Sequence, residues 1–501
     1  MEATVFYILL TSLPLSLSLP IGETEPSYMP GPDGRGTIEL LWSCLLTFGL
    51  CVWTVFHPNV IPWTKFWNQI YYRMGGMLGT IVFPELLVFF ALGQYLQAKK
   101  VLKSWEKQFE GSIEKEWLGK QGAFFVVMGG FEVEFQVPAQ STTCESKESR
   151  TDAQVSSDPA INEKRDLVNE LRDRRKFVTT IRPDGFCKLL EEQWFRNLIK
   201  SQKLSKDYFC ERNIADKGNA DNIAKFLVSV QILWMCIQCL GRELSGLPIT
   251  LLEGHILIQI LYSVVAYSLW WDKPLDIAEP ISLPLPSDKI CSLIQPRTEF
   301  NPRPFFITEH TSCNSPTQMF ARVAYDVANY NTHPLEACAM LMALLNGGLH
   351  AIAWDSHFPT ATEQLLWRIS CVGTGALLPM IFSVMWKNGS EPYIVRALLN
   401  MTVQNEDSGF GTFLAEMWRA AKDMHEGRLI CGEEDDNSSR PVWPVWLPKW
   451  ARIFVPILFF TLLLGYLFCI LYLTVESFLS MRSLPKGAYS TVEWSDFIPH
   501  V

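Results

Sequence analysis

Apolar residues in this chain are gathered into long runs that alternate with charged blocks. A helix that crosses a membrane needs roughly 20 mostly apolar residues. Runs near that length lie at about 38–56, 76–96, 226–240, 249–271, 335–354, 366–386 and 451–476. The pattern predicts an all-α, polytopic transmembrane helix bundle of about seven spans. Five is the lower bound, because the third run is short and the fifth contains Glu336 and Asn346.

The segments between these runs suggest a division of the chain. Residues 1–20 are either a cleaved signal peptide or an uncleaved anchor, and 21–37 form a Pro/Gly-rich linker. The expected order is then transmembrane pair 38–96, aqueous insert 97–225, transmembrane pair 226–271, loop 272–334, transmembrane pair 335–386, loop 387–450, last helix 451–476 and tail 477–501.

The aqueous insert is expected to carry two kinds of structure. The stretch AFFVVMGGFEVEFQV (123–137) surrounds Gly129-Gly130, which predicts a small β-hairpin. The stretches at 161–178 and 186–200 have apolar residues on one helical face and predict amphipathic helices. The second could lie on a membrane surface or pack against its neighbours.

Composition agrees with a membrane protein whose loops are acidic. The chain is 48% hydrophobic and 19% charged, with a net charge of -9. These values give no sign of nucleic-acid binding. The expected partners are the lipid bilayer and a small-molecule or ion ligand.

Two signals on orientation disagree. Sequons at Asn388, Asn400 and Asn437 all fall in 387–450, which a cleaved signal and seven spans would place in the lumen as glycosylation sites. Lys99, Lys100 and the nearby Lys103 follow the second span directly and favour the cytosol at that end. We favour the arrangement that the sequons support, in the secretory pathway or the plasma membrane.

Ionisable residues inside the apolar runs are the first candidates for function, since a charge in hydrocarbon is costly unless protein or water surrounds it. Glu85 follows Pro84 in GTIVFPELLVFF, and a proline there predicts a kink. Glu85 is either a pathway residue or a packing residue bonded to a neighbouring helix. Glu253 and His255 lie within two turns of the start of their run and are further pathway or ligand candidates.

The motif WWDKPLDI (270–277) has two interpretations. Asp272 and Asp276 form a DxxxD pair that could hold Mg²⁺ and a diphosphate. Alternatively, Trp270 and Trp271 mark the headgroup level, Asp272 and Lys273 meet water, and Pro274 ends the helix. The boundary interpretation is favoured, because no second DxxxD faces the first from another span.

His350, Asp355 and His357 are a second, weaker set of metal candidates at the connection between the fifth and sixth runs. Histidine and aspartate are metal-ligand types, but this spacing is not an established one.

The stretches RGTIELLWSCLLTFGLCVWTVFHPNV (35–60) and WWDKPLDI resemble those of a group of uncharacterised fungal multipass membrane proteins. The resemblance extends over most of the chain. It implies a membrane-protein class and a fungal source, but it supplies no activity for any residue.

Three hypotheses on function follow. The favoured one is an intramembrane pathway or pocket for a small molecule or ion, centred on Glu85 with Glu253 and His255. The second is a membrane-embedded enzyme acting on a lipophilic, isoprenoid-like substrate, and only this one calls for a cofactor, Mg²⁺ at Asp272 and Asp276. The third is a non-catalytic membrane scaffold.

Overall fold

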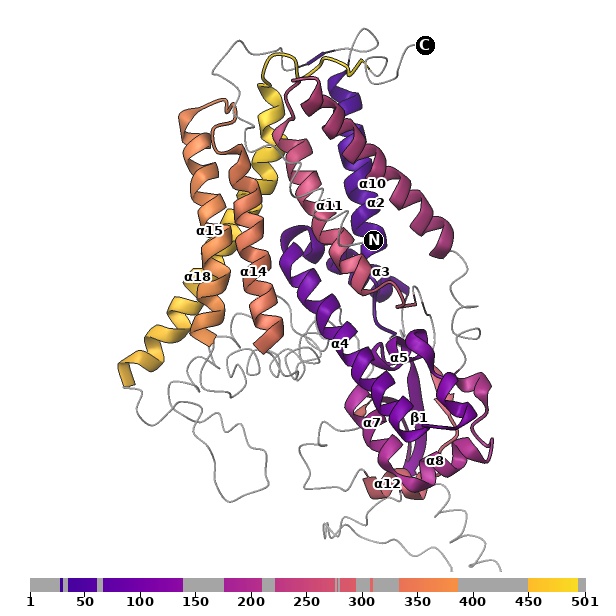
Figure 1. Ribbon diagram of the computed structural model, residues 1–501. Coiled ribbons are helices and arrows are strands. Elements are labelled where there is room, and N and C mark those ends of the chain that lie inside the picture. The colour runs from indigo at the N-terminus through magenta and orange to yellow at the C-terminus, as the bar shows by residue number, and fades with distance from the viewer. Residues whose placement is uncertain are drawn as a thin grey trace, which may run out of the picture.

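The computed structural model describes residues 28–29, 35–60, 66–137, 175–209, 221–274, 277, 280–293, 307–309, 333–385 and 449–493. Within these residues the protein is mostly helical. A bundle of long helices fills the upper part of Figure 1, and a domain that contains a small sheet lies at its lower right.

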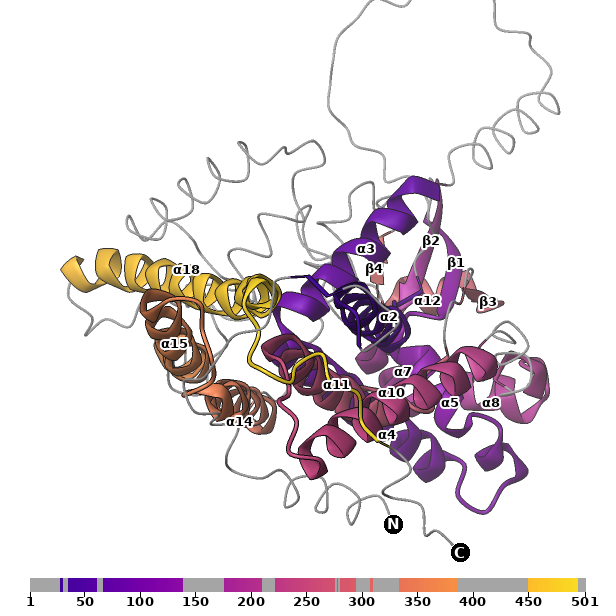
Figure 2. The same ribbon diagram turned by 90° about the horizontal axis from the view of Figure 1, so that it is seen from above.

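The bundle consists of two groups of helices, seen end-on in Figure 2. One group contains α2 (Thr37–Val55), α10 (Asp221–Leu244) and α11 (Leu251–Leu269). The other contains α14 (His333–His350), α15 (Ala361–Met385) and α18 (Lys449–Leu479). α4 (Pro84–Gln108), preceded by α3 (Phe66–Val82), packs against α11 of the first group and α14 of the second. Residues of both groups therefore meet around the start of α4.

Five of the described helices are long and apolar enough to cross a membrane: α2, α10, α11, α15 and α18. The α3–α4 pair would add a sixth if it is counted as one broken span. α14 falls short because its apolar stretch, Ala337–Ala353, has fewer than 18 residues. These helices suggest a membrane protein, with a number of spans at the lower end of the expected range.

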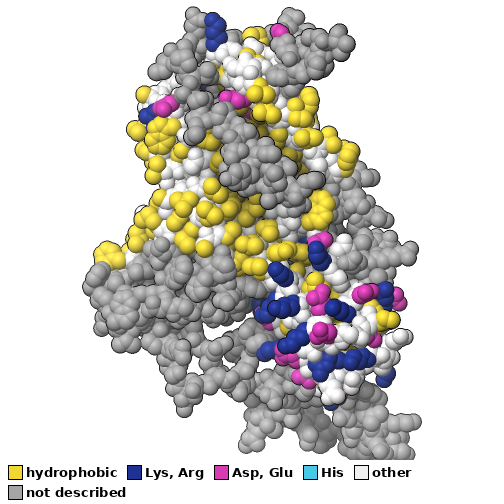
Figure 3. Space-filling view, in the orientation of Figure 1, with side chains coloured by type: hydrophobic (Ala, Val, Ile, Leu, Met, Phe, Trp, Pro, Cys, Tyr) yellow, Lys and Arg dark blue, Asp and Glu magenta, His cyan; other side chains and the backbone are white. Residues whose placement is uncertain are grey.

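The surface agrees with this division. Figure 3 shows apolar side chains spread over the bundle, whereas Lys, Arg, Asp and Glu gather over the domain around α5, α7 and α8. Large apolar residues exposed on the bundle include Trp42, Leu233, Trp234, Leu365, Ile369 and Leu464. Exposed apolar surface on this scale is typical of helices that face lipid.

Close helix contacts in the second group depend on glycine. A Cβ built on Gly347 of α14 would lie 2.3 Å from the main-chain oxygen of Cys371 and 2.7 Å from the main-chain nitrogen of Gly375, both on α15. Small residues allow helix backbones to approach in this way. Gly347, inside the fifth apolar run, thus allows α14 to pack closely against α15.

The second domain contains a four-stranded sheet in the order β3-β1-β2-β4. β1 (Phe131–Val137) pairs antiparallel with β2 (Arg175–Ile181), with Glu132 opposite Thr180. β3 (Ile281–Leu283) joins β1 in parallel, and β4 (Ile307–Glu309) joins β2 antiparallel. The sheet therefore takes strands from the expected loop 272–334 as well as from the insert 97–225.

The helices η1 (Ile113–Glu116), α5 (Gly119–Val127), α7 (Pro183–Glu191), α8 (Gln193–Lys200), η2 (Lys206–Tyr208) and α12 (Ser287–Leu293) complete this domain. Its core is aromatic. Trp105 of α4 packs with Phe186 of α7 and with Phe209, and Phe131 of β1 stacks on Phe186. α4 thus begins in the bundle and ends in the core of the second domain (Figure 1).

The expected hairpin at 123–137 was wrong. Only its second half is a strand, and the first half belongs to helix α5. Phe124, Phe125, Val126 and Val127 are all buried, so this continuous apolar run does not show the alternation of a half-exposed strand. Gly129, at φ +78°, turns the chain from the helix into β1 instead of closing a hairpin. Of the expected amphipathic helices, the region 186–200 lies in α7 and α8, whereas 175–178 belongs to β2 and 161–174 lies outside the described residues.

Candidate functional site

A broken helix creates the polar site inside the bundle. α3 ends at Val82, α4 begins at Pro84, and the two helices are bent by 114° at this break. Proline suits the first position of a helix because its missing N–H has no partner there and its φ is already fixed. The kink expected at Pro84 is thus a complete break. It places Glu85 in the first turn of α4, where the side chain is fully buried.

Glu85 is held by two neutral side chains from other helices. Asn346 Nδ2 of α14 lies 2.5 Å from Oε1, and the hydroxyl of Tyr466 of α18 donates to Oε2 at 2.9 Å. The Tyr466 ring also stacks on Phe83 at the break, with 5.8 Å between ring centroids. The carboxyl therefore connects the break to two of the three helices of the second group, α14 and α18, and its hydrogen-bond partners among the described residues are both neutral.

Asn346 links Glu85 to two histidines. Its main-chain oxygen lies 2.9 Å from Nδ1 of His350, one turn later on α14. His350 Nε2 in turn lies 3.0 Å from Nδ1 of His255 on α11. We call the five residues Tyr466, Glu85, Asn346, His350 and His255 the polar chain. All of them are at most 1% exposed, and they come from four helices.

Two atoms of the polar chain have no hydrogen-bond partner within the described part of the protein: Asn346 Oδ1 and His255 Nε2. A buried polar atom without a partner costs free energy, and each such atom calls for an explanation. With both histidine rings neutral these two atoms are acceptors, so each can accept a hydrogen bond from water, and His255 Nε2 can also bind a proton.

Glu253 was expected to join Glu85 and His255, but it lies in a different cluster. Its carboxyl pairs with Arg35 just before α2, and Oε2 accepts from the main-chain nitrogen of Thr250 at 3.0 Å and from the Thr250 hydroxyl at 2.9 Å. The Thr250 side chain accepts in return from the main chain of Glu253. This reciprocal capping box, reinforced by an ion pair, begins α11.

The WWDK segment follows α11 directly, as expected, but Lys273 does not meet water. Its ammonium is 1% exposed and lies 2.6 Å from the main-chain oxygen of His57, 2.8 Å from Gln94 Oε1 and 3.2 Å from Asn59 Oδ1. The nitrogen also lies 4.7 Å from the centroid of Trp270. Burial lowers the pKa of Lys273 well below its usual range. The expectation was wrong because a lysine can satisfy three acceptors inside a protein as well as in water.

The two tryptophans also differ from each other. Trp271 is 60% exposed, as expected of a residue at a headgroup level, whereas Trp270 is 3% exposed and packs on His57 and Lys273. The segment therefore closes the end of α11 against the exit of α2 and the middle of α4.

The metal candidates do not gather in the described structure. Asp272 lies 3.7 Å from Lys120, at the surface of the second domain, and Asp276 lies outside the described residues. Asp355 pairs with Arg368, and His357 lies 3.2 Å from Ser483 Oγ. His350 belongs to the polar chain. Among the described residues no three His, Cys, Asp or Glu side chains are grouped to hold a metal ion.

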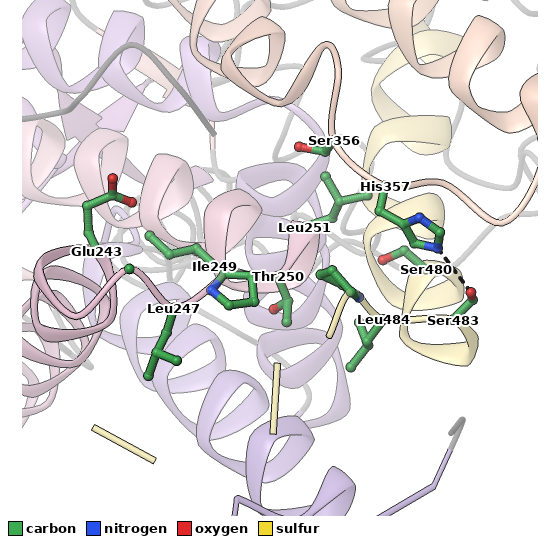
Figure 4. Close-up of a pocket in the computed structure, with 13 residues that line it drawn as sticks. Glu243, Leu247, Ile249, Thr250, Leu251, Ser356, His357, Ser480, Ser483 and Leu484 are labelled. Carbon is green, nitrogen blue, oxygen red and sulfur yellow. Dashed lines mark hydrogen bonds between the residues drawn. The ribbon is translucent and has the colours of Figure 1, made fainter. Parts of the chain in front are cut away.

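A cavity of about 160 Å³ lies at the end of the bundle away from the second domain. Figure 4 shows its wall, formed by the α10–α11 connection, the segment before α15 and the end of α18. Thr250, His357, Ser480 and Ser483 give it polar groups. Leu251 also lines it, one turn before His255 on α11. One residue of the cavity wall is thus close in sequence to His255, the last member of the polar chain.

Sequence reasoning missed two members of the polar chain. Asn346 was noticed only as a residue that weakens an apolar run, and Tyr466 gave no signal because tyrosine is common near membrane surfaces. His350 was assigned to a metal group instead of a partner for His255. The sequons at Asn388, Asn400 and Asn437 lie outside the described residues.

Comparison with known proteins gives a family but no activity. A family of unknown function, DUF8562, matches residues 4–156 and 201–301, just over half of the chain, and the chain belongs to it. The match includes Glu85, Glu253 and His255 and ends before α14. No curated protein and no solved structure matches the chain. The suggested fungal source stays an expectation.

Proposed function

We propose that this member of the family is an integral membrane protein that moves protons along an intramembrane pathway, with Glu85 as the group that takes up and releases the proton. The observation that carries the proposal is a fully buried carboxyl at a helix break, bonded only to neutral donors and linked through Asn346 to two histidines. Carboxyls and imidazoles in the interior of a membrane bundle are the groups from which proton relays are built.

Asn346 can serve both protonation states of Glu85. An amide offers donors on one side and an acceptor on the other, and the two orientations are nearly the same in shape. With Nδ2 toward Glu85 it stabilises the carboxylate. Turned over, its Oδ1, which has no partner among the described residues, accepts from the protonated acid. Proton uptake therefore requires no helix to move.

The histidine pair gives the pathway a direction. His350 Nδ1 faces a carbonyl oxygen, so it must donate, and in a neutral ring Nε2 is then an acceptor. His255 Nδ1 consequently donates to His350, which leaves His255 Nε2 as an open acceptor. His255 is also the member of the chain nearest in sequence to the cavity-lining Leu251. We infer that protons reach His255 from the cavity end and pass to His350. Because His350 meets Asn346 only at its main-chain oxygen, an acceptor, we propose that a water molecule carries the proton from His350 to Glu85.

The test is proton flux into liposomes that contain the purified protein and a trapped pH-sensitive dye, driven by a valinomycin-clamped potassium potential. We expect flux above that of protein-free liposomes, and we expect Glu85→Gln to reduce it to the protein-free rate. Glu39→Gln, which alters an exposed carboxyl on α2, is the matched control and should conduct like the parent. Equal flux in parent and Glu85→Gln would overturn the proposal.

The location also remains a proposal. We propose a membrane of the secretory pathway or the plasma membrane, with 387–450 in the lumen, on the strength of the three sequons. Glycosidase-sensitive mobility of the expressed protein supports this orientation, and labelling of that loop from the cytosol contradicts it.

A further inference from the structure

A second group of carboxyls lies near the cavity, separate from the polar chain. Glu363 is in the first turn of α15, and Glu476 is in the last turns of α18. Glu476 is 1% exposed and stands one turn before Ser480, which lines the cavity. The side chain of Glu363 is 20% exposed.

Tyr472 brings these two residues to one place. Its hydroxyl lies 3.2 Å from the main-chain oxygen of Glu363 and 3.2 Å from Oε2 of Glu476. Glu363, through its main-chain oxygen, and Glu476, through its carboxyl, thus flank the same hydroxyl. Arg482, in the 3-10 turn η5 (Ser480–Arg482), pairs with Oε1 of Glu363.

These contacts satisfy only one oxygen of each carboxyl. Glu363 Oε2 and Glu476 Oε1 are buried and have no hydrogen-bond partner among the residues that the structure describes. An unpartnered carboxylate oxygen in the interior is costly. Two carboxylates and one guanidinium leave one negative charge without compensation, so the arrangement is short of one positive charge.

We propose that this group, one helical turn from the cavity-lining Ser480, is a binding site for a monovalent alkali cation, Na⁺ or K⁺, coordinated by the free oxygens of Glu363 and Glu476 together with the Tyr472 hydroxyl. Carboxylate, hydroxyl and carbonyl oxygens are the ligands of hard cations. The single uncompensated charge favours a monovalent ion, since a divalent ion would leave the site with a net positive charge.

The site is independent of the proton pathway. Tyr466 and Tyr472 are six residues apart on α18, and they bond to Glu85 and Glu476 respectively. A variant that removes one carboxyl therefore leaves the other group intact. If both proposals hold, the protein offers separate sites for a proton and an alkali cation, as an exchanger requires.

The experiment is thermal unfolding of the purified protein in detergent, in sodium, potassium or choline chloride at equal ionic strength. A ligand that binds only the folded state raises the unfolding temperature, and the rise grows with its concentration. We expect a rise of about 3 °C or more in an alkali chloride relative to choline chloride. Glu476→Gln should abolish this difference, and Tyr472→Phe should shift it to higher salt concentrations. Glu85→Gln and Glu39→Gln should both retain it.

Equal unfolding temperatures in choline and alkali chlorides would overturn the proposal and assign the position to a bound proton. Persistence of the alkali-dependent rise in Glu476→Gln would overturn it as well. Binding of radioactive ²²Na⁺ to the parent protein is the second measurement, which stays decisive if Glu476→Gln fails to fold. Since Glu85→Gln keeps the cation site, failure of the proton proposal leaves this result unchanged.

Discussion

Glu85 and Glu253 are both completely buried carboxyls near helix N-termini, yet their surroundings differ in charge. Glu253 faces a guanidinium and closes a capping box, so each of its oxygens has a permanent donor. Glu85 faces an amide and a phenol, both neutral. A buried carboxylate with a cation partner holds its charge, whereas one with neutral partners can gain or lose a proton at much smaller cost.

The difference separates a structural role from a functional one. Both residues stood out in the sequence for the same reason, a carboxylate within an apolar run. Only the partners, contributed by Arg35 at one site and by Asn346 and Tyr466 at the other, distinguish them. The comparison predicts that changes at the charged site affect stability most, and that changes at the neutral site affect proton movement most.

The largest effect on stability is expected from Arg35→Met. The substitution leaves the Glu253 carboxylate buried without its cation, which typically costs about 3–5 kcal/mol. The free energy of unfolding in mixed detergent micelles measures this loss. The double variant Arg35→Met with Glu253→Met should recover most of it, because replacing both charges by apolar groups is often nearly neutral. A loss of stability in Arg35→Met no larger than that in Tyr466→Phe would refute the comparison.

A smaller effect is expected from Tyr466→Phe. The variant removes one of the two donors to Glu85 and keeps the ring that stacks on Phe83, so it should lose about 1 kcal/mol of stability. Tyr95→Phe is the matched control, because Tyr95 is 38% exposed on the same helix as Glu85. Equal stability of the two variants would show that the phenol of Tyr466 does not support Glu85.

Glu85→Gln should change stability least, by about 0.5 kcal/mol or less in either direction. Glutamine has the size of glutamate, can accept from Tyr466 and can donate to the free Oδ1 of Asn346. The same assay measures the free energy of unfolding of this variant and of Glu253→Gln. Glu253→Gln loses an ion pair and should be clearly less stable. A large loss in Glu85→Gln would mean that the carboxylate is held charged, against the proposed proton exchange.

The sequence predicted the long helices well, because their apolar runs depend on length and composition alone. α2, α11 and α15 lie within a few residues of the runs from which they were predicted. The break before α4 was also predictable, since Pro84 acts on its own local backbone. The number of spans was less so, because α14 combines an apolar stretch with the polar Asn346 and with glycines that serve packing.

Side-chain partners from distant segments could not be predicted. Tyr466 lies 381 residues from Glu85, and nothing local to either residue indicates the contact. Lys273 was misplaced for a related reason, since its acceptors come from α4 and from the segment after α2. A charged residue after a helix end usually meets solvent, and only the tertiary structure makes this one an exception.

The uninterrupted course of α4 joins the buried carboxyl mechanically to the second domain. The helix has 25 residues with Glu85 in its first turn, and Trp105 lies in the aromatic core at its other end. At a rise of 1.5 Å per residue these two positions are about 30 Å apart, so a tilt of about 5° at the break displaces the Trp105 end by about 3 Å. α4 is in this sense a lever arm: Asn346 can serve both protonation states of Glu85 without a tilt, but any tilt imposed at the break reaches the folded domain enlarged.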